Sequence, residues 1–327
     1  MSDKSDNACT YLTDVSPSDK PWDTNRSHSQ GVEHLYRQAD YQQYAARMHD
    51  CSRLLGFVLQ AEDTGDLRHK LKIARFCRVR HCPVCQWRRQ MTWRARFFDA
   101  IPRFLNDYPK ARFIFLTLTV QNCPLNELRD TVGRMNKAWK RMADRKQFST
   151  VLGWVKSVEV TRSSDDQAHP HFHVLLAVKP SYFTTGYVKQ ADWREIWRQC
   201  LRVEYLPVVN VKTVKPKKGQ SHEQIHDDLL AGLLETLKYS VKPSDLVGRR
   251  DRTDEQNAAW LSELTQQLHK TRAVAVGGNL RGYLSESEPD DGEMINPDGE
   301  SEASDSELQI WYGWREMVKR YAITDHQ

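Results

Sequence analysis

Four cysteines near the start of the sequence have the spacing of a metal site. Three form a C-x4-C-x2-C segment and one stands 26 positions before it, which gives Cys51, Cys77, Cys82 and Cys85. A C-x2-C turn presents two sulfurs to one ion, and thiolates suit tetrahedral zinc. We therefore predict a closed Zn²⁺ site that shapes the chain and performs no chemistry, with His69 or His81 as substitutes for the fourth ligand. The alternative is a group of small buried cysteines.

A pair of histidines lies on one face of a predicted strand at residues 171–178. Alternate residues of a strand point to the same side, so His171 and His173 share a face and Phe172 lies on the other. Two imidazoles at this spacing can hold one divalent ion. A chain with twelve histidines can also contain such a pair by chance, so the prediction depends on a third ligand.

The third ligand depends on the register of the hairpin that this strand forms with residues 152–161. Directly opposed residues of an antiparallel pair share a face. A turn centred on Asp165 sets Glu159 opposite His171, and a turn centred on Asp166 sets it opposite His173. A turn centred between the two aspartates pairs Glu159 with Phe172 on the other face, where it cannot be a ligand. Two imidazoles and one carboxylate leave open positions for substrate oxygens, as in a catalytic ion site. His169 is the alternative third ligand.

A third set of reactive side chains lies on a helix predicted at about residues 222–241. At about 100° per residue, Glu235, Tyr239 and Lys242 fall within a stripe about 60° wide, and the leucines of the segment face the other way. The helix would pack by its leucines and present a carboxylate, a phenol and an ammonium group together. The alternative is an ordinary surface set with the tyrosine at its boundary.

The elements around these residues predict an α+β domain with a central antiparallel sheet. Strand and helix patterns follow in the order β-α-β-β-α-β-α, with two βαβ-like halves, which is typical of a ferredoxin-like (split βαβ) fold. The elements are a strand at 112–120, a helix from Pro124, strands at 152–161 and 171–178, a helix at about 188–203, a strand at 207–214 and the helix at about 222–241.

Charge is unevenly distributed along the chain. The net charge is +5, but residues 286–307 hold ten acids and no lysine or arginine, so the remainder carries +15. Residues 68–112 alone carry +11, which indicates a polyanionic partner such as DNA. The alternative is a solvated charged face. The six predicted DNA-binding arginines interleave the cysteines and three aromatic residues, and they are Arg75, Arg78, Arg80, Arg88, Arg89 and Arg94.

Composition also predicts how the chain is divided. Polar residues predict a mostly disordered start, and the acidic run predicts a disordered linker before an amphipathic helix. The expected segments are the N-terminal one at 1–45, a basic zinc-binding region at 46–105, the domain of the predicted sheet at 106–245, a helical extension at 246–283, the acidic linker at 284–307 and the C-terminal helix at 308–327.

Two broad classes of protein are excluded by composition. No run approaches roughly 18 apolar residues, and the mean hydropathy is −0.71, which excludes a membrane span. The polar, acid-containing N-terminus matches neither a signal peptide nor a transit peptide. We therefore expect a cytoplasmic protein, in which seven cysteines favour metal binding over disulfides.

Three of these segments, in this order, resemble the motifs of the HUH endonucleases, and specifically of plasmid rolling-circle replication initiator (Rep) proteins with one tyrosine and a nearby glutamate. FLTLTVQN (115–122) is similar to the first motif, HPHFHVLLA (169–177) to the second and ETLKYSVK (235–242) to the third. FCRVRHCPVCQWRR (76–89) is similar to the cysteine segment that precedes the first motif in this group. The resemblance covers roughly residues 45–245.

The resemblance implies a metal-dependent, site-specific DNA endonuclease and strand transferase. Tyr239 would attack a phosphodiester of single-stranded DNA, leaving a 5′-phosphotyrosine and a free 3′-OH. Mg²⁺ or Mn²⁺ at the histidine site would polarise the phosphate, and Lys242 would stabilise developing charge. Glu235 would activate water at termination, so that the protein is released. The implied partners are plasmid origin DNA, both duplex and single-stranded, a host helicase and a single-strand-binding protein.

Alternatives of two kinds stay open. Within the same superfamily, the chain could be a single-tyrosine transposase or a conjugative relaxase. Relaxases usually have a third metal-binding histidine, and His169 would correspond to it. In another class, it could be a non-enzymatic zinc-containing DNA-binding regulator, for which the basic cysteine region suffices and Tyr239 is dispensable. The sequence leaves homo-oligomer formation open.

Overall fold

The computed structural model divides the chain into two compact units, each assembled from segments that are distant in the sequence. The first unit contains residues 1–92, 246–258 and 289–327, and the second contains residues 93–245 and 259–288. The residues that the structure describes are 10–61, 67–214, 241–297, 299 and 309–325.

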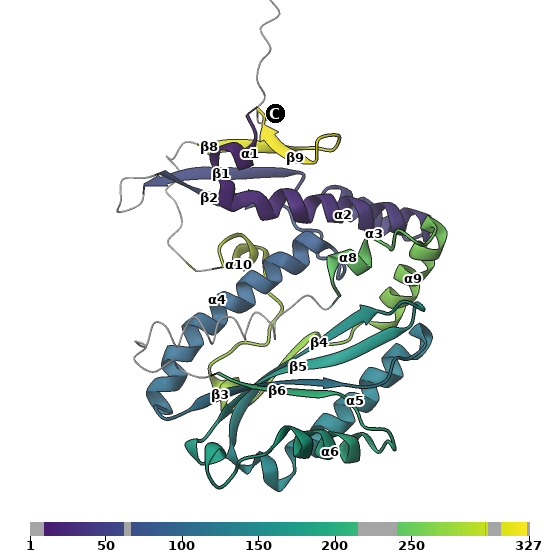
Figure 1. Cartoon of the computed structure of the whole chain (residues 1–327). Coiled ribbons are helices and arrows are strands. Elements are labelled where there is room, and N and C mark those ends of the chain that lie inside the picture. The colour runs from purple at the N-terminus through teal and green to yellow at the C-terminus, as the bar shows by residue number, and fades with distance from the viewer. Residues whose placement is uncertain (1–9, 62–66, 215–240, 298, 300–308, 326–327) are drawn as a thin grey trace, which may run out of the picture. The chain divides into compact units, whose positions relative to one another are not determined.

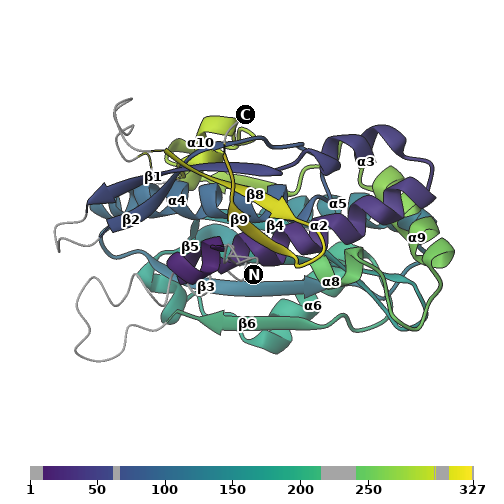
Figure 2. The same ribbon diagram turned by 90° about the horizontal axis from the view of Figure 1, so that it is seen from above.

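The first unit is built on a four-stranded antiparallel sheet with the order β2-β1-β8-β9. One hairpin comes from the start of the chain and the other from its end, so the two ends share one sheet (Figures 1 and 2). The elements of this unit are α1 (Leu12–Val15), α2 (Lys20–Gln38), α3 (Gln42–His49), β1 (Leu54–Ala61), β2 (Leu67–Ala74), α10 (Asp291–Ile295), β8 (Gln309–Arg315) and β9 (Arg320–Ile323).

The N-terminal segment is more ordered than its polar composition predicted. Helix α2 buries Trp22, Val32, Leu35 and Tyr36. These residues form an apolar stripe among polar neighbours, and the stripe gives the helix a face to pack. Disorder over residues 1–45 is therefore wrong for the part that the structure describes, which begins at residue 10.

The C-terminal aromatic segment forms strands β8 and β9, so the helix predicted at 308–327 is wrong. Tyr312 and Trp314 are buried at the two-residue interval of a strand. Lys319 lies in the hairpin turn with a φ of 53°, and the backbone N–H of Tyr321 donates to Asp23 of α2 at 2.9 Å. In a short aromatic segment, helical and strand periodicity are hard to distinguish, and pairing with β1 decides in favour of the strand.

The second unit is built on a five-stranded antiparallel sheet with the order β6-β3-β5-β4-β7. Its elements follow the predicted order β-α-β-β-α-β, and β5 lies between β3 and β4. The helix predicted at 222–241 lies outside the described residues up to residue 240. The elements are β3 (Arg112–Thr119), α5 (Leu128–Ala143), β4 (Val151–Arg162), β5 (Ala168–Val178), α6 (Gln190–Leu201), β6 (Val209–Thr213) and β7 (Val274–Gly278).

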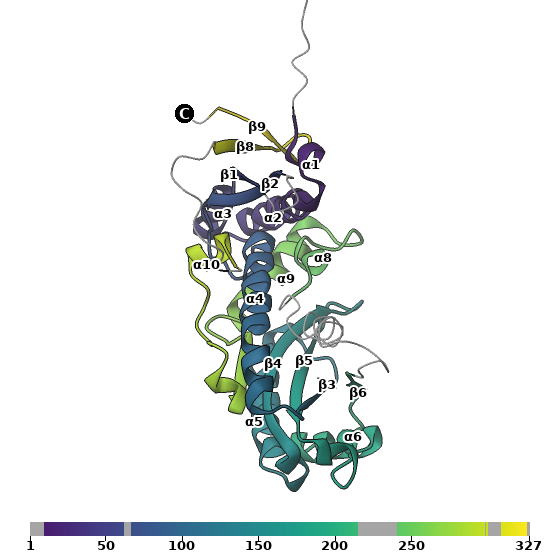
Figure 3. The same cartoon turned by 90° about the vertical axis from the view of Figure 1, so that its left-hand side faces the viewer.

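Different helices cover the two faces of this sheet (Figure 1). The long helix α4 (Pro83–Asp107; Figure 3) begins in the first unit, and its C-terminal half packs Phe104 into the same apolar core as Leu175 of β5. Helices α5 and α6 cover the other face, where the rings of Trp197 and Phe172 have centroids 6.2 Å apart. Odd-numbered residues of β5 therefore face α4, and even-numbered ones face α5 and α6.

The segments predicted as a helical extension and as a disordered linker both contain secondary structure that was not expected. Residues 246–283 include the end of α8 (Pro243–Leu246) and α9 (Asp254–Gln267), but they also supply strand β7. A Cβ on Gly277 of this strand would lie 2.2 Å from the Trp154 ring, so its close pairing with β4 requires glycine. The predicted disordered linker contains α10 in its described part. Among the helices that the structure describes, none is long and apolar enough to cross a membrane.

Candidate active site and metal centres

A carboxylate and two imidazoles meet on the odd-numbered face of the five-stranded sheet. Glu159 of β4 stands directly opposite His171 of β5, so the hairpin is centred on Asp165. The Oε2 atom of Glu159 accepts hydrogen bonds from Nε2 of His171 at 2.9 Å and from Nε2 of His173 at 2.7 Å. Candidate ligand atoms of the three residues lie within 4.8 Å of one another. The expected approach of Glu159 to the histidines is confirmed.

This cluster is buried, and its groups are electrostatically coupled. Glu159 is 3% exposed, and the two histidines are also buried. Burial alone would raise the pKa of Glu159, but the hydrogen bonds and charges of His171 and His173 outweigh it and hold that pKa well below its usual range. Oε1 of Glu159 is buried and has no hydrogen-bond partner among the described residues. An ionised carboxylate with unused lone pairs beside two imidazoles is a donor set that fits a divalent cation.

The backbone orients the first of these histidines. Nδ1 of His171 lies 3.2 Å from the carbonyl oxygen of His169. When Nδ1 carries a proton and donates it to that carbonyl, Nε2 can bind a metal ion in place of the proton that it shares with Glu159. His169 thus contributes its carbonyl, and its ring centroid lies 5.5 Å from that of His171. Within the described part of the chain, the potential ligand group contains Glu159 and not His169, so the geometry favours Glu159 as the third ligand.

Two threonines that the sequence analysis did not single out border the cluster. Thr117 of β3 stands opposite His173, and Thr119 stands opposite His171, so all four side chains share one face. The Thr119 hydroxyl donates to the carbonyl of Val208 at 3.0 Å. Two threonines at alternate positions in a mostly apolar strand are the signal that could have revealed them.

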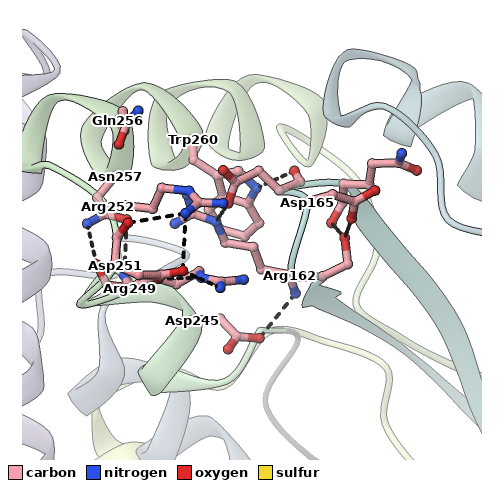
Figure 4. A network of polar contacts seen from close by, with 12 residues as sticks. Arg162, Asp165, Asp245, Arg249, Asp251, Arg252, Gln256, Asn257 and Trp260 are labelled. Atoms are coloured by element: carbon pink, nitrogen blue, oxygen red, sulfur yellow. Dashed lines mark hydrogen bonds and ion pairs between the residues drawn. The ribbon is translucent and has the colours of Figure 1, made fainter.

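The chain that follows residue 240 is anchored to the end of β4 that extends beyond its pairing with β7. Val241 forms a parallel bridge with Val160, and the carboxylate of Asp245 accepts the backbone N–H of Arg162 at 3.3 Å (Figure 4). The guanidinium of Arg162 lies over the ring of Trp260, 4.8 Å from its centroid. Two contacts four residues apart therefore hold this segment against the strand that carries the cluster's carboxylate.

The described residues include one of the three side chains predicted on the catalytic helix. Lys242 follows Val241 directly and is exposed. Tyr239 and Glu235 lie outside the described residues. The roles assigned to these three residues therefore stay predictions.

The four predicted cysteine ligands meet in the first unit. The Sγ atom of Cys51 lies 3.7 Å from those of Cys82 and Cys85, and Sγ of Cys77 lies 3.6 Å from that of Cys85. Four sulfurs bound at about 2.3 Å to one tetrahedral zinc ion would lie about 3.8 Å apart, whereas a disulfide needs about 2.05 Å. All four residues are buried free thiols. The grouping is confirmed, and its geometry fits Zn²⁺.

Three segments bring these cysteines together. Cys51 follows α3, Cys77 follows β2, and Cys82 and Cys85 lie at the start of α4. Hydrogen bonding to Cys77, Cys82 and Cys85, together with burial, raises the pKa of Cys51 well above its usual range. Because several thiolates cannot be buried together without a compensating cation, the site needs a metal to ionise fully.

The two histidines considered as substitute ligands lie outside this cluster. Nε2 of His69 lies 3.2 Å from the hydroxyl of Tyr312. His81 is fully buried, and burial, with added repulsion from Arg80 and Arg89, lowers its pKa to about 3. The substitution of either histidine for a cysteine ligand is therefore wrong.

The predicted DNA-binding arginines differ in exposure. Arg88 is 5% exposed and donates to the carbonyls of Met294 at 2.6 Å and Ile295 at 3.1 Å. This placement removes Arg88 from the predicted set, because its donors are used inside the fold. Among the other members, Arg75 and Arg94 are exposed, and Arg78, Arg80 and Arg89 are half-buried.

The sequence is similar to known replication proteins over most of its length. The profile of the family described as Replication protein matches residues 68–322. The Protein rep of Streptococcus pneumoniae serotype 2 (strain D39 / NCTC 7466) is 31% identical over 314 residues, which cover 93% of this chain and 92% of that protein. The Protein rep of Lentilactobacillus hilgardii is 32% identical over 318 residues, which cover 95% of each chain. A Replication protein of Staphylococcus aureus is 30% identical over 233 residues, which cover 69% of this chain and 96% of that protein. No solved structure matches.

Proposed function

This chain belongs to the replication protein (Rep) family, and on that basis we propose that it initiates rolling-circle replication of a plasmid. The proposed reaction is a metal-dependent, site-specific cleavage of one DNA strand at the origin, followed by transfer or release of that strand. Tyr239 is the proposed nucleophile, Lys242 stabilises the charge that develops, and Glu235 activates water at the end of the cycle.

The observation that carries this proposal is the buried contact of Glu159 with His171 and His173. Their ligand atoms converge from two neighbouring strands, and Oε1 of Glu159 has no partner among the described residues. Carboxylate oxygen and imidazole nitrogen suit Mg²⁺, Mn²⁺ and related ions, and an open coordination shell suits phosphate chemistry. Such an ion would polarise the scissile phosphate when bound.

Strand order gives independent support for an HUH domain. The strand that carries the histidines, β5, lies between β3 and β4. These two neighbours carry the segment similar to the first motif and Glu159, respectively. A central strand flanked in this way is what a split βαβ sheet provides.

Chain connectivity supports Tyr239 as the nucleophile. In the sequence, Tyr239 precedes Val241 by two residues. Val241 is bridged to Val160, the neighbour of Glu159. The described chain that directly follows the proposed nucleophile is thus held beside the strand that contributes the carboxylate.

The proposed cleavage is a transesterification at phosphorus. The phenolic oxygen of Tyr239 gives up its proton and bonds to phosphorus while the bond to the 3′ oxygen breaks, and that oxygen takes up a proton to become the priming 3′-OH. A phenol with a reference pKa of about 10 is a weak nucleophile at neutral pH, so the nearby cation Lys242 favours the phenolate. The phosphodiester is exchanged for a phosphotyrosine ester, so a later 3′-OH can reseal the strand without a nucleotide cofactor.

The second proposed reaction is the hydrolysis that terminates replication. Glu235 stands four residues before Tyr239 in the sequence, and we assign it as the general base that removes a proton from water. The hydroxide attacks phosphorus and releases the phenol of Tyr239, which leaves a 5′-phosphate on the DNA. The protein is then released from the DNA and no longer carries a covalent adduct.

The remaining parts of the proposal concern recognition. The Cys₄ group holds a structural Zn²⁺ that shapes the basic region, and the exposed arginines of that region contact origin duplex, while the nicking domain holds single-stranded DNA. Family membership further suggests a host helicase and a single-strand-binding protein as partners in the cytoplasm.

A covalent-adduct assay tests the proposal. Labelled single-stranded DNA carrying the origin of the encoding plasmid is incubated with the full chain and Mn²⁺ and then analysed under denaturing conditions. We expect an adduct that Tyr239→Phe abolishes and that Tyr187→Phe, a change at an exposed tyrosine of the same unit, retains. An adduct that persists in Tyr239→Phe excludes this nucleophile. Salt-sensitive binding without an adduct under any divalent ion favours a non-enzymatic DNA-binding regulator.

A further inference from the structure

A cavity of about 400 Å³ opens on the even-numbered face of the five-stranded sheet, the side opposite the Glu159 cluster. Helix α5, strand β4 and the chain around β7 line it. Its lining includes Arg129, Lys156 and Arg272, and among the described residues it contains no acid. A volume of this size lies within the usual range for small-ligand sites, roughly 300–1,000 Å³.

The floor of the cavity contains an ammonium group without a counter-ion. Lys156 is 5% exposed, and its Nζ donates to Oδ1 of Asn136 at 2.7 Å and lies 3.8 Å from the ring centroid of Phe172. Among the described residues, it has no carboxylate within ion-pair distance. A buried ammonium is costly when it is unpaired, and an anion in the cavity would compensate it.

Two arginines are fixed around the same cavity. The guanidinium of Arg129 donates to the carbonyls of Gln266 and His269, at 2.8 Å each. Arg272 is paired with Glu286 at 2.6 Å. These contacts hold both cations in place at the cavity, although Glu286 reduces the net charge that Arg272 contributes.

Helix α5 leaves space for a ligand to approach. A Cβ placed on Gly133, which lines the cavity, would meet no atom within 4 Å. The lining therefore combines open volume, a buried ammonium with unused donor capacity and two positioned guanidinium groups. Lysine and arginine in this arrangement suit the oxygens of a phosphate group.

We propose that this cavity is a second phosphate-binding site, separate from the proposed nicking site and formed by Lys156 with Arg129 and Arg272. The phosphate belongs either to a small phosphorylated ligand or to the backbone of bound DNA. The two sources present the same chemistry to the cavity, and the variants below distinguish them.

The test is calorimetric titration of the full chain with inorganic pyrophosphate at low ionic strength and without added divalent metal. We expect saturable binding that weakens about tenfold or more in Lys156→Met, the usual loss for a charge-assisted hydrogen bond. Gly133→Met should weaken it similarly by filling the cavity, and it should retain the fold because methionine favours a helix more than glycine does. Lys137→Met, at an exposed position of α5, is the matched control and should change affinity less than twofold.

The same variants titrated with a single-stranded oligonucleotide identify the source of the phosphate. If the cavity takes a DNA phosphate, Lys156→Met and Gly133→Met weaken oligonucleotide binding as well, and pyrophosphate competes with it. If the cavity takes a small ligand, oligonucleotide affinity does not change. Pyrophosphate affinity equal to wild type in both variants, or no pyrophosphate binding by the wild type, overturns the proposal. Because no nicking is measured, this outcome is independent of the proposed function.

Discussion

Asp291 of α10 accepts two hydrogen bonds from the guanidinium of Arg78, at 2.9 Å from Nε and 2.6 Å from Nη2. The carbonyl of Pro289 accepts a third, at 2.8 Å. Arg78 is one of the arginines predicted to contact DNA, and Asp291 belongs to the run of ten acids. An acid of the segment at 284–307 thus forms an ion pair with an arginine of the basic region at 46–105, within the first unit.

This pairing predicts that Asp291→Asn raises affinity for non-specific duplex DNA. An exposed ion pair is worth about 0.2–1 kcal/mol, so we expect a gain of up to about fivefold at low salt, measured by fluorescence anisotropy. Asp40→Asn makes the same change in net charge at an exposed site elsewhere in the unit. An equal gain in both variants would show that net charge, and not release of Arg78, is responsible.

The cluster around Glu159 predicts the effect of removing its charge. Glu159→Gln keeps the size of the side chain but loses the anion, so Mn²⁺ affinity should fall by at least roughly 10- to 100-fold, the cost of losing even a supporting group of a metal site. Electron paramagnetic resonance of free Mn²⁺ measures this directly. Glu195→Gln, an exposed acid on α6, should leave the affinity unchanged; an equal loss there would point to a general charge effect.

The Cys₄ group predicts one tightly bound Zn²⁺ per chain. Cys82→Ser should abolish zinc in the purified protein and lower the melting temperature of the first unit, because metal binding contributes to folding free energy. Zinc content is measured by elemental mass spectrometry. Cys123→Ser changes a buried cysteine outside the group and should retain the metal. A stoichiometric zinc content in Cys82→Ser would contradict the assignment.

Burial lowers the pKa of Lys156 to about 8, from 10.5. The pKa of Lys156 is lower in the folded state than in the unfolded state, so burial of the charged ammonium lowers the free energy of unfolding. This penalty is complete below about pH 8 and disappears as the pH rises toward about 10.5. Lys156→Met should therefore raise the free energy of unfolding at pH 7 by an amount on the order of 3 kcal/mol at most. The advantage should shrink steadily between pH 8 and 10.5 in denaturant titrations. A constant difference across this range would show that Lys156 is not buried in its charged form.

The role proposed for Glu235 predicts that its loss affects the first nick and the termination step differently. Glu235→Ala should leave the first nick nearly intact but reduce strand release at termination by roughly 10²- to 10⁴-fold, the usual contribution of a general base. A nicking assay on supercoiled plasmid measures the first step, and release of DNA from the preformed covalent adduct measures the second. Equal losses in both steps would count against a role limited to termination.

Local spacing was sufficient to predict several features of the two units. The β-α-β-β-α-β order follows from alternation and helical periodicity, and these are properties of neighbouring residues. The terminal segments were mispredicted because their state depends on distant partners. Residues 309–315 are strand because β1 is available to pair with them, and α2 folds with the help of contacts such as that between Asp23 and Tyr321.

By itself, the sequence determined which side chains were available: a C-x2-C turn with two further cysteines, two histidines on one strand face and a glutamate on a strand nearby. The tertiary structure decided which of them meet. The hairpin could have adopted three registers, and only the observed one sets Glu159 opposite His171. Arg88 carries the same charge as its neighbours, yet only packing against Met294 and Ile295 turns it inward. The first outcome depends on the turn that joins the two strands, which the spacing alone left open, and the second depends on a contact between residues 206 positions apart.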